Sequence, residues 1–430
     1  MPLVFAMHAT RPPLDLSLQQ ARALLAGDVT DWTALGEPAS PLRIIAGPGA
    51  GDVAVIARAR SDTAAMAAVE TRRDAIAIVP AAALGPSARA LTVDGIHPLL
   101  DPVTYPLKVT GEPAGPVTTL ILVGDIMLAR RVGDRLRTNG DDAFPFRLVA
   151  EQLSAADLTI GNLESALARL GPPTQSDAFA ADPRARAGLT LAGFDLLSLA
   201  NNHTGDFGPR SLLETIQQLR AVEIPTVGAG GTRRDARRPV ILERHGVRFG
   251  FLAFNAIGET PAATADQPGA VQIRMQPRTG PLNQRDLDAF TNMIAALRPR
   301  VDVLVVLPHW GAQYTHERHR DQRRVARALA QAGADLIIGG HPHWVQGVDL
   351  LDETFVAYSL GNFVFDMDFM QQTQEAIAIE LVFWGSELKA ADLLPVRVGS
   401  DFRPRFVSAA AGDSILRDIW RHSPPPFRLD

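Results

Sequence analysis

The polar residues that directly follow the apolar segments of this chain carry side chains that proteins use to bind divalent cations. In chain order they are Asp125, Glu164, Asn202, His203, His309, His341 and His343. Carboxylate oxygens, amide oxygens and imidazole nitrogens suit Mn²⁺, Fe²⁺, Zn²⁺ or Mg²⁺. When two such cations share a carboxylate, about 3.5–4 Å apart, they can activate a water and hold a phosphoryl oxygen. The residue types therefore predict a site for one or two divalent metal ions, with Mn, Zn or Fe as candidates.

Each of these residues also has a simpler interpretation. Asp125 precedes the helical pattern LARRVGDRL and is typical of a helix N-cap. Asn202 favours a turn, and Glu164 in a loop is ordinarily a solvated charge. His309 beside Trp310 is ordinarily a packed core histidine. The coincidence of all of them after apolar runs favours a metal site over a set of unrelated roles.

Alternating apolar and helical patterns after Val117 predict the elements that position these side chains. Apolar runs predict strands over 119–124, 156–162, 194–201, 247–254, 301–308, 334–340 and 354–361. Amphipathic patterns predict helices over 211–222 and 322–333. Strands that are apolar along their whole length are typical of an α/β fold in which helices cover a sheet. Ligands of such sheets bind at the carboxyl ends of the strands, so we expect the polar residues to meet at one edge of one sheet.

Residues 1–110 have the pattern of a separate small α/β unit. Strands are expected over 3–8, 43–47 and 74–80, with a helix over 16–27. The proline- and glycine-rich segment 102–116 predicts an exit from this unit, with 111–116 as a linker. A second domain is expected over 117–400 and a C-terminal extension over 401–430. The stretch 257–285 is expected to form a long loop over the site.

Composition disfavours several classes of protein. The chain of 430 residues has a formal net charge of −5 and no basic block, which disfavours nucleic-acid binding. It has no cysteine, which excludes disulfides, thiolate zinc sites and cysteine nucleophiles. No segment reaches 18 consecutive apolar residues, and the N-terminus lacks the pattern of a signal peptide. We expect either a cytoplasmic protein or, if a targeting segment is missing from this chain, one of the bacterial cell envelope or extracytoplasmic space.

A family resemblance is carried by six motifs that occur in order: GDIMLARRV, GNLESAL, LANNHTGDFG, PHWGAQY, ADLIIGGHPHWVQGV and AYSLGNFVFD. They closely resemble the CapA family, whose members take part in capsule and poly-γ-glutamate biosynthesis. The resemblance covers about residues 117–400. It implies a calcineurin-like metallo-dependent phosphatase fold, which is a four-layer α/β sandwich with a dinuclear metal site at strand ends.

The resemblance also implies ligands for two metals. Asp125 and His343 look like ligands of a first metal. Glu164 takes the bridging position, where phosphoesterases usually have Asp. The second metal would be held by Glu164 together with Asn202, His309 and His341.

The implied activity is that of a metal-dependent hydrolase acting on an anionic small molecule or polymer. His203 resembles the histidine that protonates the leaving group. Arg130, close after Asp125, is a candidate catalytic anion contact because arginine pairs bidentately with phosphate or carboxylate; a helix-surface arginine is the alternative. Tyr358 and Asn362 are expected at the pocket floor, with packing as the alternative for Tyr358. The alternative function is non-catalytic, metal-assisted binding or anchoring of an anionic polymer during export.

The N-terminal segment 1–110 is similar to part of a phosphate-type periplasmic solute-binding protein. The stretch GPGAGD (47–52) stands where such proteins have a Ser-Gly-Thr anion loop. Anion binding, a docking or regulatory role, and a vestige of a longer chain remain open for this segment.

Two departures from the motifs lead to a prediction about metal content. Met127 replaces the histidine of the usual Asp-x-His motif, and Gln313 replaces a common Glu. The first metal therefore has fewer ligands than the second, and we expect unequal affinities with one site empty as purified. Elemental analysis of the purified protein checks this, and two tightly held metals per chain would contradict it.

Overall fold

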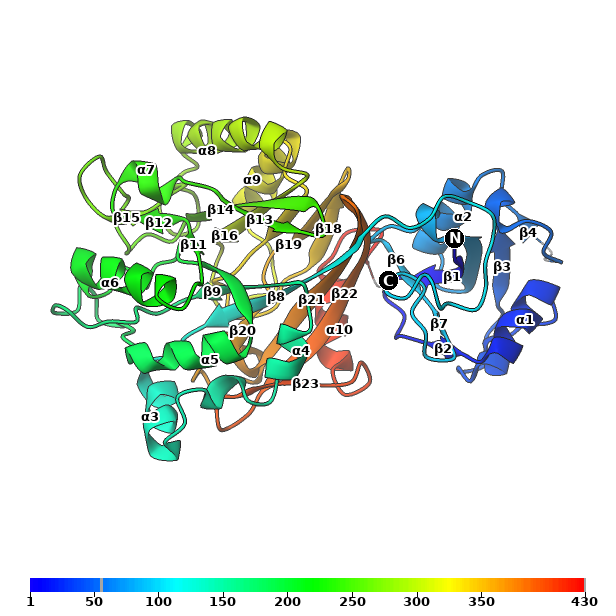
Figure 1. The fold of residues 1–430 in the computed structure, drawn as a ribbon, viewed down its shortest axis with the longest axis horizontal. Helices are drawn as coiled ribbons and strands as arrows, with labels where there is room; N and C mark the ends of the chain where they lie inside the picture. Colours follow the sequence, from blue (N-terminus) through cyan, green and yellow to red (C-terminus); the bar gives the residue numbers. More distant parts are fainter. Residues whose placement is uncertain (55–56, 429–430) are drawn as a thin grey trace. The chain divides into compact units, whose positions relative to one another are not determined.

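The computed structural model describes residues 1–54 and 57–428, and the chain divides into two compact units. The first comprises Met1–Thr119, Glu380–Asp392 and Pro424–Asp430, and the second comprises Leu120–Ile379 and Leu393–Ser423. Figure 1 shows the elements of each unit. All the candidate site residues belong to the second unit.

The first unit is built around a five-stranded sheet in the order β4-β3-β5-β1-β6. Its elements are β1 (Leu3–His8), α1 (Leu18–Ala26), β3 (Arg43–Ala46), β4 (Ala57–Arg58), α2 (Asp62–Glu70), β5 (Ala75–Pro80) and β6 (Ala88–Ala90). β1 and β5 are buried along their whole length, as continuous apolar sequences predict. Helix α1 begins at a capping box between Ser17 and Gln20 and ends at Gly27 in the left-handed conformation. The strands and the helix expected in this segment are confirmed.

Two large sheets contain most of the strands of the second unit, and parts of β8, β21 and β22 belong to the first unit. One has eight strands in the order β11-β10-β9-β8-β21-β22-β23, with β20 paired to β8. Its strands are β8 (Val117–Ile126), β9 (Leu158–Leu163), β10 (Phe194–Ser198), β11 (Thr226–Val227), β20 (Asn362–Val364), β21 (Glu375–Trp384), β22 (Glu387–Val398) and β23 (Pro404–Phe406). The pairs β8–β9, β9–β10 and β8–β20 are parallel, so the carboxyl ends of these strands lie at the same edge.

The other sheet has six strands in the order β13-β14-β16-β17-β19-β18. They are β13 (Val240–Arg244), β14 (Val247–Asn255), β16 (Val303–His309), β17 (Leu336–Ile338), β18 (Val348–Leu351) and β19 (Thr354–Ala357). The neighbours β14, β16, β17 and β19 are parallel, with the two outer strands antiparallel.

Helices pack on one face of each sheet, while the other faces meet. Residues of α3 (Arg130–Asn139), α5 (Arg186–Leu191) and α6 (Gly208–Arg220) share an apolar core with β8 and β10. Residues of α8 (Gln284–Leu297) and α9 (Arg320–Gln331) share another with β14, β16 and β17. From the opposite faces, Leu122 of the first sheet and Leu307 of the second line one cavity of about 20 Å³. That volume suits one water, and Asp125 and His309 lie at its wall.

The expected strands and helices of this unit are confirmed, but the expectation of one sheet edge is wrong. β8, β9, β10 and β20 belong to one sheet, whereas β16 and β17 belong to the other. Strands that are buried on both faces have the same continuous apolar pattern in either sheet, so the pattern does not reveal which strands pair. The polar strand ends therefore converge from two sheets.

Two further sequence expectations concern the loop and the membrane. The stretch 257–285 contains only β15 (Gly269–Ala270) and the first residues of α8, so the long loop is confirmed. Over the described residues, no helix combines the length and the apolar character needed to cross a membrane.

The close approach of β8 and the segment before β20 predicts a sensitive glycine. A Cβ added to Gly124 would lie 2.0 Å from the backbone oxygen of Gly361, which cannot move as a side chain can. We expect Gly124→Ala to lower the free energy of unfolding by about 3 kcal/mol, measured by urea denaturation. Gly231→Ala is the control, because its Cβ would meet nothing closer than 3.5 Å. Equal stability of the two variants would contradict the close packing at Gly124.

Candidate metal centre

Strand ends from the two sheets bring the candidate ligands into one buried cluster. Asp125 is the second-last residue of β8, Glu164 follows β9, and His309 is the last residue of β16. Asn202 and His203 follow β10, and the two histidines of GGHPH follow β17. Each of these residues is at most 5% exposed: Asp125, Glu164, Asn202, His203, His309, His341 and His343.

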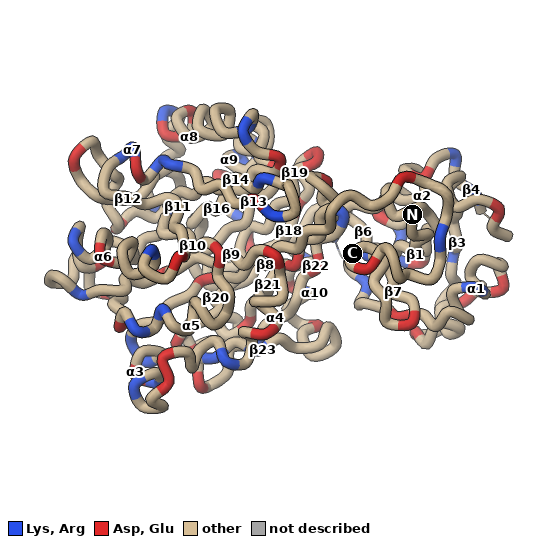
Figure 2. Tube along the Cα trace, viewed as in Figure 1, with Lys and Arg blue, Asp and Glu red and all other residues tan. Residues whose placement is uncertain are grey.

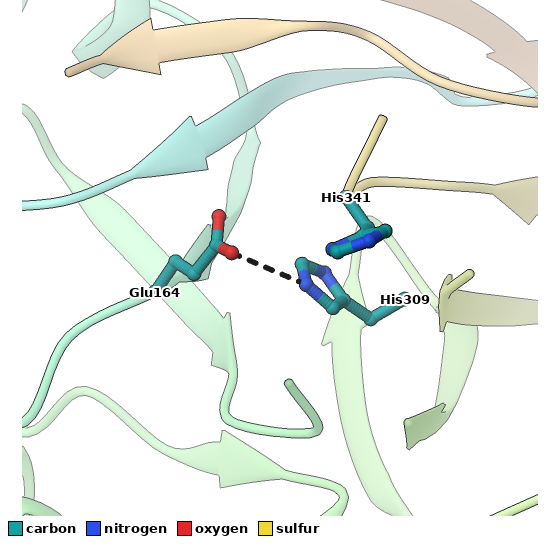
Figure 3. A group of neighbouring side chains, drawn as sticks. All are labelled: Glu164, His309 and His341. Atoms are coloured by element: carbon teal, nitrogen blue, oxygen red, sulfur yellow. Dashed lines mark ion pairs between the residues drawn. The ribbon is translucent and has the colours of Figure 1, made fainter. Parts of the chain in front are cut away.

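Glu164, His309 and His341 form one group of possible metal ligands. One ligand atom from each lies within 4.8 Å of the others. Figure 3 shows the carboxylate of Glu164 pointing toward the imidazoles of His309 and His341. Glu164 Oε1 lies 3.3 Å from His309 Nε2. Asn202 Oδ1 lies 2.9 Å from the same His309 nitrogen and adds an amide oxygen to this group.

Asp125, Glu164 and His343 form a second group with the same spacing. His343 Nδ1 lies 3.7 Å from Asp125 Oδ2. Glu164 belongs to both groups, so one carboxylate lies between two sets of possible ligands. This is the arrangement in which two cations share a bridging carboxylate.

The donor atoms fit a divalent cation. Neither carboxylate oxygen of Glu164, nor either ring nitrogen of His341, has a hydrogen-bond partner among residues 1–54 and 57–428. Both side chains are fully buried. An unsatisfied buried polar group costs about 1–3 kcal/mol, and more when it is charged. Coordination to a cation would remove that cost for both residues.

Two asparagines hold the strand ends together. Asn162 Nδ2 donates to Asp125 Oδ1 at 2.8 Å and lies 3.2 Å from His309 Nδ1, so it links the two sheets. Asn201 Nδ2 donates to Asn162 Oδ1 at 3.0 Å, and Asn201 Oδ1 accepts from the backbone of His203 at 3.1 Å. Asn201 is therefore a framework residue, whereas its neighbour Asn202 faces the ligand group.

The parallel pairing of β20 with β8 places Asn362 opposite Asp125. There Asn362 Oδ1 lies 2.8 Å from His343 Nδ1, while Asn362 Nδ2 donates to Thr373 O. The amide thus presents its oxygen to the histidine, which requires His343 Nδ1 to carry the proton. The lone pair of His343 then lies on Nε2, the arrangement seen when a metal-binding histidine is oriented by a second residue.

The GGHPH segment bends tightly around Asp125. The backbone N–H of His341 donates to Asp125 Oδ2 at 3.0 Å. His341 and His343 have positive φ angles of 95° and 59°, which are uncommon for residues other than glycine. A Cβ at Gly340 would lie 2.4 Å from Asp125 Oδ1, so glycine is needed there. The bend lets two histidines two residues apart face the same cluster, which a straight strand would not allow.

Burial shifts the pKa values of the cluster strongly. It raises the pKa of Asp125 to about 7, helped by the charge of Glu164, and it raises the pKa of Glu164 to about 8. Burial lowers the pKa of His309 to about 4 and that of His343 to about 3, and it holds the pKa of His341 well below its usual value. Without a cation, the site near neutral pH thus favours neutral side chains.

His203 lies beside the ligand groups in a different electrostatic setting. Its Nδ1 is 2.8 Å from Asp206 Oδ2, and its ring stacks on Phe179 with 3.8 Å between centroids. Burial lowers the pKa of His203, but the hydrogen bond to Asp206 and the nearby carboxylates outweigh it and leave the pKa above its usual value. His203 is therefore the histidine of the cluster best able to carry a proton.

Arg130 lies at the edge of the cluster and does not contact the ligand groups directly. Its guanidinium is 4.4 Å from the centroid of Phe179 and pairs with Asp177 at 2.9 Å and with Asp366. It lies close enough to Glu164 to lower the pKa of that carboxyl against the effect of burial. Its side chain is 33% exposed, so one side faces solvent.

Some site residues were not predicted from the sequence, and for Tyr358 the contacts agree with the packing alternative. Asp206 and Phe179 support His203, but only the position of Asp206 three residues after it gave a signal. Tyr358 packs against Trp310, and its hydroxyl lies 3.3 Å from Asp349, so packing is its role. These contacts depend on loops whose paths the sequence pattern does not give.

In the first unit, the segment GPGAGD (47–52) contacts the carboxylate of Asp62. Gly49 N donates to Asp62 Oδ1 at 3.0 Å, and a Cβ at Gly47 would lie 2.0 Å from the same oxygen. The carboxylate of Asp62 therefore lies where a loop of this kind would otherwise approach an external anion.

Comparison with known proteins matches residues 119–367 to the family described as bacterial capsule synthesis protein PGA_cap. Among curated relatives, the capsule biosynthesis protein CapA of Bacillus anthracis is 30% identical over 311 residues, which is 70% of this chain and 72% of that protein. The PGA biosynthesis protein CapA of Bacillus subtilis strain 168 is 30% identical over 266 residues, which is 61% of this chain and 67% of that protein.

A solved structure bears on the predicted solute-binding resemblance. A phosphate ABC transporter substrate-binding protein from Clostridium perfringens, with bound phosphate, matches 25% of this chain and 51% of its own chain at 19% identity. The TM-score is 0.22, which is too low to support an argument. The resemblance of residues 1–110 to a solute-binding protein therefore stays a prediction.

The raised carboxyl pKa values predict that metal binding releases protons. At pH 7 Glu164 is mostly protonated and Asp125 partly so, because their pKa values are about 8 and about 7. A cation must displace these protons, so titration of metal-free protein with Mn²⁺ at pH 7 should release about one proton or more. Calorimetry in buffers of different ionisation enthalpy measures this release.

At pH 9 both carboxyls are ionised, so the release should nearly vanish and the affinity should be higher. Proton release that is absent at pH 7, or equal at both pH values, would contradict this assignment of the cation ligands.

Proposed function

The chain belongs to the family of bacterial capsule synthesis proteins that includes CapA of capsule and poly-γ-glutamate biosynthesis, and from this premise we propose that its buried cluster is the centre of a metal-dependent hydrolase. The observation that carries the proposal is Glu164, a fully buried carboxylate without a hydrogen-bond partner in the described chain, shared by two groups of possible ligands. The proposal includes a calcineurin-like four-layer α/β sandwich, supported by two facing sheets with helices on their other faces.

One or two divalent cations, with Mn²⁺, Zn²⁺ or Fe²⁺ as candidates, would be held by residues from both sheets. Asp125, Glu164 and His343 would hold one, while Glu164, Asn202, His309 and His341 would hold the other. Such cations act as Lewis acids that polarise a phosphoryl or carbonyl oxygen and neutralise its charge. Their ligands leave the substrate class open between a phosphoester and a carboxylate-bearing polymer.

His203 is our candidate for the general acid. Asp206 accepts a hydrogen bond from the N–H at Nδ1 of His203 and so fixes the imidazole, leaving Nε2 to transfer a proton to a leaving oxygen. The raised pKa keeps a proton available near neutral pH. Stacking on Phe179 fixes the plane of the ring.

Arg130 remains our candidate for an anion contact. A guanidinium has five N–H donors, and the pairs with Asp177 and Asp366 use only part of them. These two carboxylates orient Arg130 over Phe179 while its exposed side faces solvent. This position suits a substrate group that enters from the solvent.

The second candidate function is metal-assisted binding of an anionic polymer without catalysis. It is favoured by the depth of the cluster, because every candidate ligand is at most 5% exposed. A cation in such a site can stabilise the fold even when no substrate reaches it.

Replacement of His203 separates the two functions. We expect His203→Ala to retain its metal but to lose about 10²-fold or more in phosphoesterase rate, because general acids contribute about this factor. The loss should be larger for a phenyl than for a 4-nitrophenyl phosphoester, since the more basic leaving oxygen needs the proton more. Rates with Mn²⁺, Zn²⁺ and Fe²⁺, with metal content measured on the same samples, check this.

The exposed His245 offers a matched control, and His245→Ala should leave both quantities unchanged. A wild-type protein that holds metal but hydrolyses neither ester would favour the binding function. Equal losses for both leaving groups would remove the general-acid role.

A further inference from the structure

A groove lined by four arginines runs between α8 and α9 on the second unit. Its volume is about 490 Å³, and its arginines are Arg320, Arg323, Arg324 and Arg327. Gln284 and Leu287 of α8 form the facing side. All four arginines are exposed.

The arginines form a row because of their spacing in α9. Positions 320, 323, 324 and 327 lie on one face of a helix, since residues three and four apart are neighbours there. The row extends about 10 Å along the helix axis at 1.5 Å per residue. The opposite face of α9 is apolar, with Val325 and Leu329 buried against the second sheet. The row is thus held in place by the packing of the helix.

The positive charge of the row is hardly neutralised by the protein. Among the described residues, no carboxylate lies within 4.0 Å of Arg323, Arg324 or Arg327. Arg324 makes one long hydrogen bond, 3.4 Å to Gln284 Oε1, and Arg320 has Asp321 at 3.8 Å. By contrast, Arg274 nearby pairs with Asp286 at 2.8 Å. Four adjacent like charges, three of them without a carboxylate within 4.0 Å among the described residues, favour an anion with several negative groups.

More arginines continue the row beyond the start of α8. A second cavity of about 370 Å³ is lined by Arg233, Arg237 and Arg274, with Asp286 of the first turn of α8. α8 therefore has arginines on both sides of its first turn. Figure 2 marks Lys and Arg in blue and shows such segments on α7 (Arg233–Ala236) and around α8.

The groove begins on the side of the molecule where the metal centre lies. α9 follows β16, whose last residue is His309, and therefore starts at the carboxyl edge of the second sheet. Gln346 lies three residues after His343, and its Oε1 accepts a hydrogen bond of 3.0 Å from Gln322 Nε2 in the first turn of α9. Gln276 N lies 3.3 Å from Asp321 Oδ2, and Arg278 in the same loop is close enough to act on the pKa of His341.

We propose that this arginine groove binds an extended polycarboxylate, so that one stretch of an anionic polymer is held beside the metal centre. Arginine pairs bidentately with carboxylates, and a row of them matches a chain that repeats its carboxylates. No aromatic residue lines either cavity within the described chain, so the stacking surfaces that single-stranded nucleic acids use are missing here. The inference rests on the proposed function for its polymer class.

The test is binding of end-labelled poly-γ-glutamate to the full-length protein, followed by fluorescence anisotropy. Arg323→Gln/Arg324→Gln/Arg327→Gln should weaken the apparent affinity about 10-fold or more at low salt and should reduce its dependence on salt. Arg210→Gln/Arg220→Gln/Arg300→Gln is the matched control. It removes the same charge from exposed arginines on α6 and after α8, and it should bind as the wild type does.

Metal content and thermal unfolding of each variant separate this proposal from that for the metal centre. If both triple variants weakened the affinity for poly-γ-glutamate equally, binding would depend on general charge attraction, and the proposal that the groove is the binding site would be wrong. So would unchanged binding by the α9 variant, absence of binding by the wild type, or tighter binding of a labelled oligonucleotide than of the polycarboxylate. None of these outcomes changes the measured metal content, so the proposal for the metal centre is tested independently of the groove.

Discussion

The buried charge of Glu164 is the constraint on which the rest of the site depends. Glu164 has no exposed surface and no hydrogen-bond donor among the described residues, so its ionised form is unstable and burial raises its pKa to about 8. His309 and His343 do not neutralise it as cations, because burial lowers their pKa values, whereas the charge of His203 opposes the effect of burial on Glu164. Near neutral pH the buried carboxyls are either protonated or balanced by an external positive charge, and a divalent cation is the charge that we propose for this position.

The amide side chains around the cluster hold the ligands without adding charge. Asn162 links Asp125 to His309, Asn201 holds Asn162, and Asn362 orients His343. More carboxylates in these positions would add repulsion in a site that already contains two. The backbone contributes as well, since the N–H of His341 contacts Asp125 through a bend that needs Gly340. The cluster thus depends on the way in which the two sheets face each other, with Asn162 in contact with both.

The buried cluster and the arginine groove of the second unit differ in how far solvent screens their charges. In the metal centre, charges are buried and must be matched closely, so each misplaced group is costly. In the arginine groove, charges are exposed and screened, so several weak contacts are needed to hold a ligand. A polymer suits the second situation because it presents many anionic groups at once, whereas a reacting bond suits the first.

The sequence by itself determined most of the secondary structure, the candidate ligand residues and their position at or after strand ends. Those properties depend on local pattern: continuous apolar runs for buried strands, and Asp125, Glu164, His309 and the GGHPH histidines directly after them. Only the tertiary structure decided that β16 and β17 belong to a different sheet from β8 and β9, and that Asp206 contacts His203 while Asn362, expected at the pocket floor, contacts His343. Strand pairing depends on contacts between residues distant in sequence, and a strand that is apolar on both faces carries no mark of its neighbour.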